Sequence, residues 1–588
     1  MLLSLLLLIT ISSSTSTSTL KPNSTVASTV TSPRFDYDSP CVLSDSERRD
    51  LEVHHFGREL EPYCSPRKLM QREVYTLGEH FNFSPYGTYS DPDGSEFCLP
   101  PNPINLYKLN INGIYYCPYI FTTTMPHDYE EESQGMTRCT MAETLIALGN
   151  NGEWTGYALS QIRKGGEAKF EGYPTSKDPL EKPYIKIIAA YNAATHLNAD
   201  MHSPEIAEEM IELYRAALIR DVQFGSTMHA PGRCFGCNEG PFVSQFLFQD
   251  VEDGQLKTYE QEYYTFRDQE LTIRQTIDGL NGNYGYIDFS DKRKGRPEKI
   301  HTPRGLGSLV YGDYPGTEAV KAALISHSAG VEYAGFDNYP DRSTAWMTRG
   351  LEDVVTAIGE VARYALRVAW HAKFNDLRIR PAQLGVYLDW CEKQQSLCRG
   401  TPIYKTYSYI VKNYGFPVAP SGKRTWLLAG MYPEGAPNHP AMPSGHATIN
   451  GATTTILKAM FKTVDDSGNA ITWDEATNDS MFGTAGFATR DGDRLVSSNP
   501  IFMDDVLTLT GEFNKLSINI GDGRCFAGVH FESDNEVGRL LGEDVAKAWL
   551  KNELCKYGAT KAGMVTNFKF IDLHGDLVVL KPECHSHY

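Results

Sequence analysis

The sequence lacks any long hydrophobic run. Its longest apolar stretch, LLSLLLLITI at residues 2–11, spans about ten residues, roughly half of what a membrane-spanning helix needs. The stretch suits the core of a signal peptide, although no Lys or Arg precedes it and no A-x-A cleavage site follows. The absence of a longer run predicts that no segment of the chain spans a membrane.

Positive charge is also scarce. The chain carries 55 Lys and Arg against 73 Asp and Glu, which gives a formal net charge of −18. This balance argues against nucleic acid or an anionic membrane surface as a general partner. Any local cluster of Lys and Arg is therefore more informative than it would be in a basic protein.

A complete metal-binding cysteine motif is missing as well. Cys234 and Cys237 form a C-F-G-C pair, but no second C-x-x-C and no nearby His pair accompanies it, so disulfide bonding is favoured over zinc or redox chemistry. The 12 cysteines are typical of a protein stapled in an oxidising compartment. We therefore predict a secreted protein, located outside the cell or in the cell wall.

The chain divides into three regions. Residues 1–33 read as a signal peptide followed by a Ser/Thr-rich leader, and 34–180 as a Cys/Pro/Gly-rich region packed on the rest. The remainder, 181–588, carries apolar residues at helical spacing, and a terminal hairpin is expected around His-Gly-Asp at 567–580. Helices are predicted within 203–222, 317–336, 343–374, 447–461 and 537–554. The expected fold is mainly α, a helical bundle containing two four-helix bundles, with long loops and a few short β-hairpins.

The end of the longest predicted helix gathers positive charge. Lys373 lies near that end, and Arg380 directly precedes Pro381, which pushes Arg380 out of the α region. Cations at this position can simply complement the helix dipole. They can equally serve a bound anion, and these residues alone leave both readings open.

The stretch HPAMPSGHATINGA, residues 439–452, concentrates polar groups at the start of a helix. Prolines disfavour helix before Ser444, so Ser444, Gly445 and His446 are expected at the helix N-terminus. Free backbone N–H groups and the helix dipole favour an anion there. Alternatively, Ser444 is only an N-cap and His446 a surface histidine.

A third polar stretch covers residues 521–545. Gly523 and Gly528 predict a bent loop on which Arg524 and His530 can both turn inward. The pattern S-x-x-E from Ser533 predicts a capping box that starts the next helix. Asp534 would then lie in the first turn, close to His530.

These three stretches together resemble a known family signature. The patterns K-x6-R-P, P-S-G-H and G-R-x3-G-x-H occur in that order, as they do in the vanadium-dependent haloperoxidases and the related type 2 phosphatidic acid phosphatases. The flanking segments GPFVSQFLF (240–248), LTGEFNKLSINI (508–519) and RLLGE (539–543) look most similar to those of seaweed vanadium bromoperoxidases. The resemblance covers roughly residues 200 to 550 and marks 181–588 as the catalytic domain.

The resemblance implies one vanadate per chain and a role for each matching residue. His530 would be the protein ligand of the metal, and His446 the acid–base group on the opposite side. His439 and Trp370 match further active-site positions of the family. The residues that would hold the oxygens of vanadate are Lys373, Arg380, Ser444, Gly445 through its N–H, and Arg524. Six residues separate Lys373 from Arg380, where seaweed bromoperoxidases usually have seven, so the halide preference stays open and Arg378 remains an alternative.

The implied reaction is the oxidation of bromide or iodide by hydrogen peroxide to hypohalous acid, which halogenates small organic acceptors. The resemblance also implies a homo-oligomer, a dimer or larger. One alternative is a secreted acid phosphatase of the type 2 phosphatidic acid phosphatase superfamily, in which His530 would be the nucleophile. A second is a disulfide-stapled structural glycoprotein without activity.

Overall fold

The computed structural model describes most of the second half of the chain and parts of the first. The described residues are 88–90, 96–98, 204–224, 233–253, 257–273, 275–276, 293–314, 316–334, 350–376, 378, 380–393, 395–399, 403–437, 441–477, 486–496, 506–556 and 567–581. The predicted signal peptide and leader, and nearly all of region 34–180, lie outside these residues. The three-region division of the chain stays a prediction.

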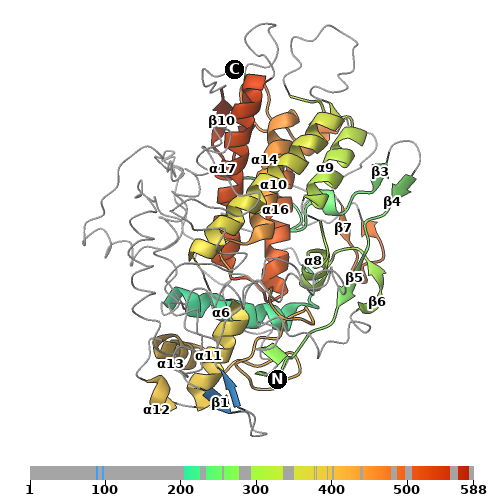
Figure 1. Cartoon of the computed structure of the whole chain (residues 1–588). Coiled ribbons are helices and arrows are strands. Elements are labelled where there is room, and N and C mark those ends of the chain that lie inside the picture. Colours follow the sequence, from blue (N-terminus) through green and yellow to red (C-terminus); the bar gives the residue numbers. More distant parts are fainter. Residues whose placement is uncertain are drawn as a thin grey trace, which may run out of the picture.

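Helices dominate the described part and pack in two groups (Figure 1). The larger group consists of α8 (Pro303–Leu309), α9 (Thr317–Ser328), α10 (Leu351–Asp376), α14 (Gly445–Met460), α15 (Trp473–Ala476), α16 (Leu509–Phe526) and α17 (Glu532–Lys556). The smaller group consists of α6 (Pro204–Ile219), α11 (Pro381–Lys393), α12 (Gln395–Cys398) and α13 (Ile403–Asn413). Each group encloses its own hydrophobic core. The prediction of a mainly α, bundled fold is confirmed.

The described strands form only short antiparallel pairs. They are β1 (Thr88–Ser90) with β2 (Glu96–Cys98), β3 (Val251–Asp253) with β4 (Lys257–Tyr259), β5 (Tyr263–Phe266) with β6 (Arg293–Glu298), β7 (Phe487–Ala488) with β8 (Leu495–Val496), and β9 (Phe568–Ile571) with β10 (Leu577–Leu580). The last pair is the predicted terminal hairpin, with Leu577 opposite Ile571. A short 3-10 helix, η2 (Gln245–Leu247), lies against the larger core.

Helices α14 and α17 approach each other closely enough for glycine to be required at the contact. A Cβ on Gly542 would lie 2.0 Å from the carbonyl oxygen of Thr448, and one on Gly451 would lie 2.3 Å from that of Arg539. No side chain fits at such distances. The contact brings the N-termini of α14 and α17 together. There the N–H of Ser444 donates to the carbonyl of Asp534 at 2.8 Å.

The prediction of a bent loop at both Gly523 and Gly528 was half wrong. The chain does turn at Gly528, whose φ is +81°, but Gly523 and Arg524 belong to the last turns of α16. Gly523 is needed for packing instead, since a Cβ there would lie 2.7 Å from the carbonyl oxygen of Leu306. Arg524 therefore projects from a rigid helix end.

The predicted capping box at Ser533 was also wrong. Helix α17 begins one residue earlier, at Glu532. The Ser533 hydroxyl instead donates to Glu209 of α6 at 2.8 Å and accepts from Arg378 at 2.7 Å. A residue with the pattern of a local cap thus links three distant segments.

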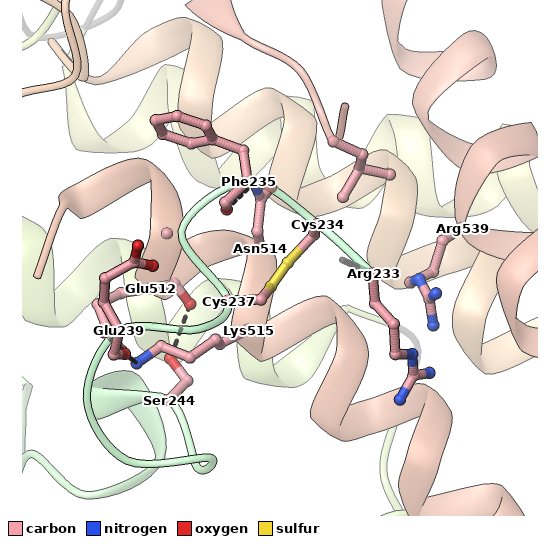
Figure 2. Close-up of a disulfide and its surroundings, with 12 residues drawn as sticks. Arg233, Cys234, Phe235, Cys237, Glu239, Ser244, Glu512, Asn514, Lys515 and Arg539 are labelled. Atoms are coloured by element: carbon pink, nitrogen blue, oxygen red, sulfur yellow. Dashed lines mark hydrogen bonds and ion pairs between the residues drawn. A yellow bond between two sulfur atoms is a disulfide. The ribbon is translucent and has the colours of Figure 1, made fainter. Parts of the chain in front are cut away.

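Two disulfides staple the described part, between Cys234 and Cys237 and between Cys391 and Cys398. Figure 2 shows the first, in a loop that lies on α16. Asn514 of α16 donates to the carbonyl of Phe235 at 3.0 Å, and Lys515 donates to that of Glu239 at 2.9 Å. The C-F-G-C pair is thus a structural staple, as predicted, and the described residues contain no His/Cys/Asp/Glu cluster of the kind that holds a metal ion.

None of the described helices combines the length and the apolar character needed to cross a bilayer. The longest, α10, carries charged residues along its exposed side and ends in the candidate site described next.

Candidate active site

The N-terminus of α14 forms one wall of the site. The helix begins at Gly445, and the Ser444 side chain caps it by accepting from the N–H of Ala447 at 3.4 Å. Ser444 is fully buried. The first N–H groups of a helix have no intrahelical acceptor and lie at the positive end of its dipole. The predicted helix N-terminus is therefore confirmed, and it offers donors to an anion.

His530 stands in the turn between α16 and α17, opposite this helix end. Its Nδ1 lies 3.0 Å from a carboxylate oxygen of Asp534, which also accepts from the N–H of Phe531 at 2.9 Å. Because a carboxylate only accepts, the proton of a neutral His530 resides on Nδ1 and the lone pair on Nε2. In metal sites generally, a carboxylate on one ring nitrogen orients a histidine so that its other nitrogen can bind the metal, and the Asp534–His530 pair has this arrangement.

Arg380 faces that Nε2. One guanidinium nitrogen of Arg380 lies 2.9 Å from Nε2 of His530 and 2.8 Å from the carbonyl oxygen of Val529, to which it donates. The backbone N–H of Arg380 donates to Gln383 at 2.7 Å at the start of α11. Arg380 is fully buried, so a charged guanidinium points directly at the candidate ligand atom.

Arg378, the alternative to Arg380, serves another purpose. Its guanidinium donates to the second carboxylate oxygen of Asp534 at 2.8 Å and lies 3.8 Å from Glu209 of α6. Burial raises the pKa of Asp534, while Arg378 and the more distant Arg380 and Lys373 oppose that shift. Arg378 therefore holds the residue that orients His530, and Arg380 is the arginine that contacts His530 itself.

Two further cations come from the ends of α10 and α16. The Nζ of Lys373 is buried and donates to the carbonyl of Ala441 at 3.1 Å, in the segment that leads into α14. Arg524 donates to the carbonyl of Val310 at 2.6 Å and lies over the ring of Tyr432, 5.2 Å from its centroid. Its Nε is buried, and no described residue accepts from it. An acceptor-rich ligand would satisfy this donor.

His446 occupies the first turn of α14, and its Nε2 lies 2.8 Å from a carboxylate oxygen of Asp313. Burial lowers the pKa of His446; the nearby Asp313 opposes this, while Arg524 and Lys373 lower the pKa further. Lys373 thus acts electrostatically on both His446 and Asp534. The two histidines flank one shared cationic region.

Sequence reasoning missed Asp313 and Tyr432. Asp313 follows α8 in the turn Y-G-D-Y-P, and Tyr432 lies in the loop before α14. Neither belongs to a motif, and each meets its partner across roughly a hundred residues of chain. Of the remaining predicted residues, Trp370 lies on α10 one turn before Lys373, and His439 lies outside the described residues.

The donor set fits a tetrahedral oxyanion. Lys373, Arg380 and Arg524 supply positive charge, the α14 N-terminus supplies N–H groups, and the His530 lone pair can bind a metal centre. Buried cations of this kind stabilise an anion strongly because no water screens them. Vanadate and phosphate share the charge and shape that such a set binds.

Comparison with known proteins finds relatives of the chain among vanadium-dependent enzymes. Residues 354–554, which include α10 through most of α17, match the family model described as the VCPO second helical-bundle domain. A vanadium-dependent bromoperoxidase of Ascophyllum nodosum is 28% identical over 430 residues, covering 64% of this chain and 72% of the relative. The chain is thus similar in sequence to vanadium-dependent haloperoxidases. A second vanadium-dependent bromoperoxidase, from Corallina pilulifera, is 32% identical over 282 residues, 44% of each chain.

The haloperoxidase fold extends beyond the region matched by the family model. The homohexameric structure of the second vanadate-dependent bromoperoxidase from Ascophyllum nodosum aligns with a TM-score of 0.55 and 20% identity. The alignment covers 96% of this chain and 95% of that one. At this identity the likeness establishes the shared fold and no more.

Proposed function

We propose that this chain is a vanadium-dependent bromoperoxidase, which oxidises bromide or iodide with hydrogen peroxide to hypohalous acid. The observation that carries the proposal is the His530 pair: Asp534 holds Nδ1, and Nε2 points toward buried Arg380. A histidine so oriented is suited to bind a metal centre. The bromoperoxidases among its relatives support the choice of reaction.

The site residues would hold one vanadate per chain. His530 would bind the metal, and the donors around it would bind the oxygens: Lys373, Arg380, Ser444, the N–H of Gly445, and Arg524. When bound, vanadate supplies a Lewis acid that activates hydrogen peroxide without changing its own oxidation state. The buried cations Lys373, Arg380 and Arg524 would withdraw electron density from oxygens held between them and would make those oxygens more electrophilic.

His446 is suited to move protons at this site. The environment lowers its pKa, which keeps the imidazole neutral and able to accept a proton near neutral pH. Asp313 fixes the ring by its contact with Nε2 and stabilises the imidazolium formed when the proton arrives. We propose that His446 takes a proton from hydrogen peroxide and returns it when hypohalous acid leaves.

A reconstitution assay tests the proposal. Protein stripped of metal is mixed with hydrogen peroxide and bromide, before and after addition of orthovanadate, with phosphate as a competitor. We expect bromination only with vanadate, and its loss in excess phosphate. Hydrolysis of a phosphate ester, inhibited by vanadate and without any halide oxidation, would show instead that the site is that of an acid phosphatase.

We also propose that the chain forms a homo-oligomer and is secreted. The homohexameric relative supports the first, and light scattering on purified protein tests it, with a monomer as the contradicting result. The two disulfides support the second, because such bonds persist in oxidising compartments. N-terminal sequencing of native protein tests secretion: an uncleaved leader would contradict it.

A further inference from the structure

Among the described site residues, solvent exposure is greatest at the Asp313–His446 pair. The side chains of His530, Arg380, Lys373 and Ser444 are at most 1% exposed. Exposure then rises to 9% and 17% at the side chains of Asp313 and His446. Product leaving the site along described residues therefore passes the Asp313–His446 pair.

Tyr314 stands at this exit. It directly follows Asp313, and it is 80% exposed, more than any other large aromatic or aliphatic residue in the described part of the chain. Its backbone is fixed on both sides: Asp313 contacts His446, and the carbonyl of Tyr314 accepts from the N–H and hydroxyl of Thr317 at 3.0 Å and 2.8 Å. An exposed phenol is thus held one residue from a side chain that touches His446.

We propose that Tyr314 is a site of self-halogenation, the first solvent-exposed phenol that hypobromous acid meets as it leaves the site. This inference rests on the proposed bromoperoxidase activity. A phenol ring is electron-rich at the carbons next to its hydroxyl, and these carbons react readily with electrophilic bromine. High exposure leaves the ring of Tyr314 open to such attack.

The reaction balances without any further reagent. A ring carbon next to the hydroxyl attacks the bromine of hypobromous acid, so that a C–Br bond forms and the O–Br bond breaks. The ring then loses the proton from that carbon, and this proton joins the departing hydroxide to form water. The ring is oxidised by two electrons and the bromine is reduced by two.

Other exposed tyrosines of the same chain provide internal controls. Tyr264 on β5 is 42% exposed and Tyr414 after α13 is 39% exposed, and neither adjoins a residue that contacts the site. If hypobromous acid acts only after mixing with the solution, the relative bromination of the three phenols should match that produced by added reagent. If it acts as it leaves, Tyr314 should gain a further advantage during turnover.

The experiment compares two sources of oxidant. In one arm the vanadate-reconstituted enzyme turns over bromide and hydrogen peroxide; in the other, reagent hypobromous acid is added to the same protein without peroxide. Peptide mass spectrometry counts the replacement of hydrogen by bromine at each tyrosine. We expect the ratio of Tyr314 to Tyr264 bromination to be several-fold higher in the turnover arm. A soluble phenol added as scavenger should protect Tyr264 and Tyr414 before it protects Tyr314.

Bromination of a soluble dye in the same samples separates the possible failures. If the dye is brominated while the ratio of Tyr314 to Tyr264 bromination is equal in both arms, the self-halogenation proposal is overturned and the bromoperoxidase assignment stands. If no dye is brominated despite vanadate, both fall together. The variant Tyr314→Phe should lose the modification at this position and keep its initial rate of dye bromination; bromine still found on that peptide would contradict the assignment to Tyr314.

Discussion

Replacing Asp534 by Asn should weaken vanadate binding, and it should also lower the stability of the fold by a comparable amount. One oxygen of Asp534 accepts from Nδ1 of His530 and the N–H of Phe531, and the other accepts from Arg378. An amide has only one accepting oxygen, so its NH₂ group must face a donor on one side. Either Arg378 loses its partner, or His530 loses the acceptor that keeps its lone pair on Nε2.

The expected losses of vanadate affinity and of stability in Asp534→Asn follow from these contacts. Loss of the group that orients a metal-binding histidine typically weakens metal binding by about 10–100-fold, or roughly 1.4–2.8 kcal/mol. A buried donor left without a partner costs about 1–3 kcal/mol of stability. Equilibrium dialysis of stripped protein against orthovanadate measures the first effect, and urea unfolding measures the second.

Glu543→Gln is the matched control. Glu543 lies on the same helix, is also buried, and pairs with Lys458 at 3.2 Å and Lys547 at 2.8 Å, away from the site. We expect it to lower stability and leave vanadate affinity unchanged. The reasoning is refuted if folded Asp534→Asn protein binds vanadate as tightly as the wild type, or if both variants weaken binding equally.

Three further predictions test other parts of the molecule. His530→Ala should abolish vanadate incorporation, and stoichiometric vanadium in that variant would contradict the ligand assignment. Asp313→Asn removes the negative charge that raises the pKa of His446, so the acid limb of the kcat/KM–pH profile should move to lower pH; a move to higher pH would be inconsistent with this pairing. Gly542→Ala, whose Cβ would meet a carbonyl at 2.0 Å, should cost about 1–3 kcal/mol in urea unfolding, whereas Gly359→Ala, with open space around it on α10, should be neutral or stabilising.

Local patterns predicted α6, α9, α10, α14 and α17 and one wall of the site, but they did not predict α11, α13 or α16. The prolines before Ser444 place the start of α14, and the spacing of His530 and Asp534 brings them within reach of each other at the start of α17. These features depend on neighbouring residues, so a sequence displays them directly. The residue roles taken from the family resemblance stay predictions, although the structure gathers the described ones in one region.

The site contacts that could not be predicted from the sequence join segments that are distant along the chain. Asp313 meets His446 across 133 residues and Arg378 meets Asp534 across 156, so no spacing rule could pair them. Ser533 carried a convincing local capping pattern, yet its hydroxyl contacts Glu209 and Arg378 instead. Tertiary partners overrode a preference that is worth only about 1 kcal/mol.

The close crossing of α14 and α17 explains why these distant residues meet at the helix ends. Gly451 and Gly542 let the two backbones touch, and that contact fixes how far one helix can slide along the other. The same register sets the N–H of Ser444 on the carbonyl of Asp534. The N-terminus of α14 is thereby tied to Asp534, whose carboxylate contacts His530. A bulkier residue at the crossing should therefore disturb the site as well as the core.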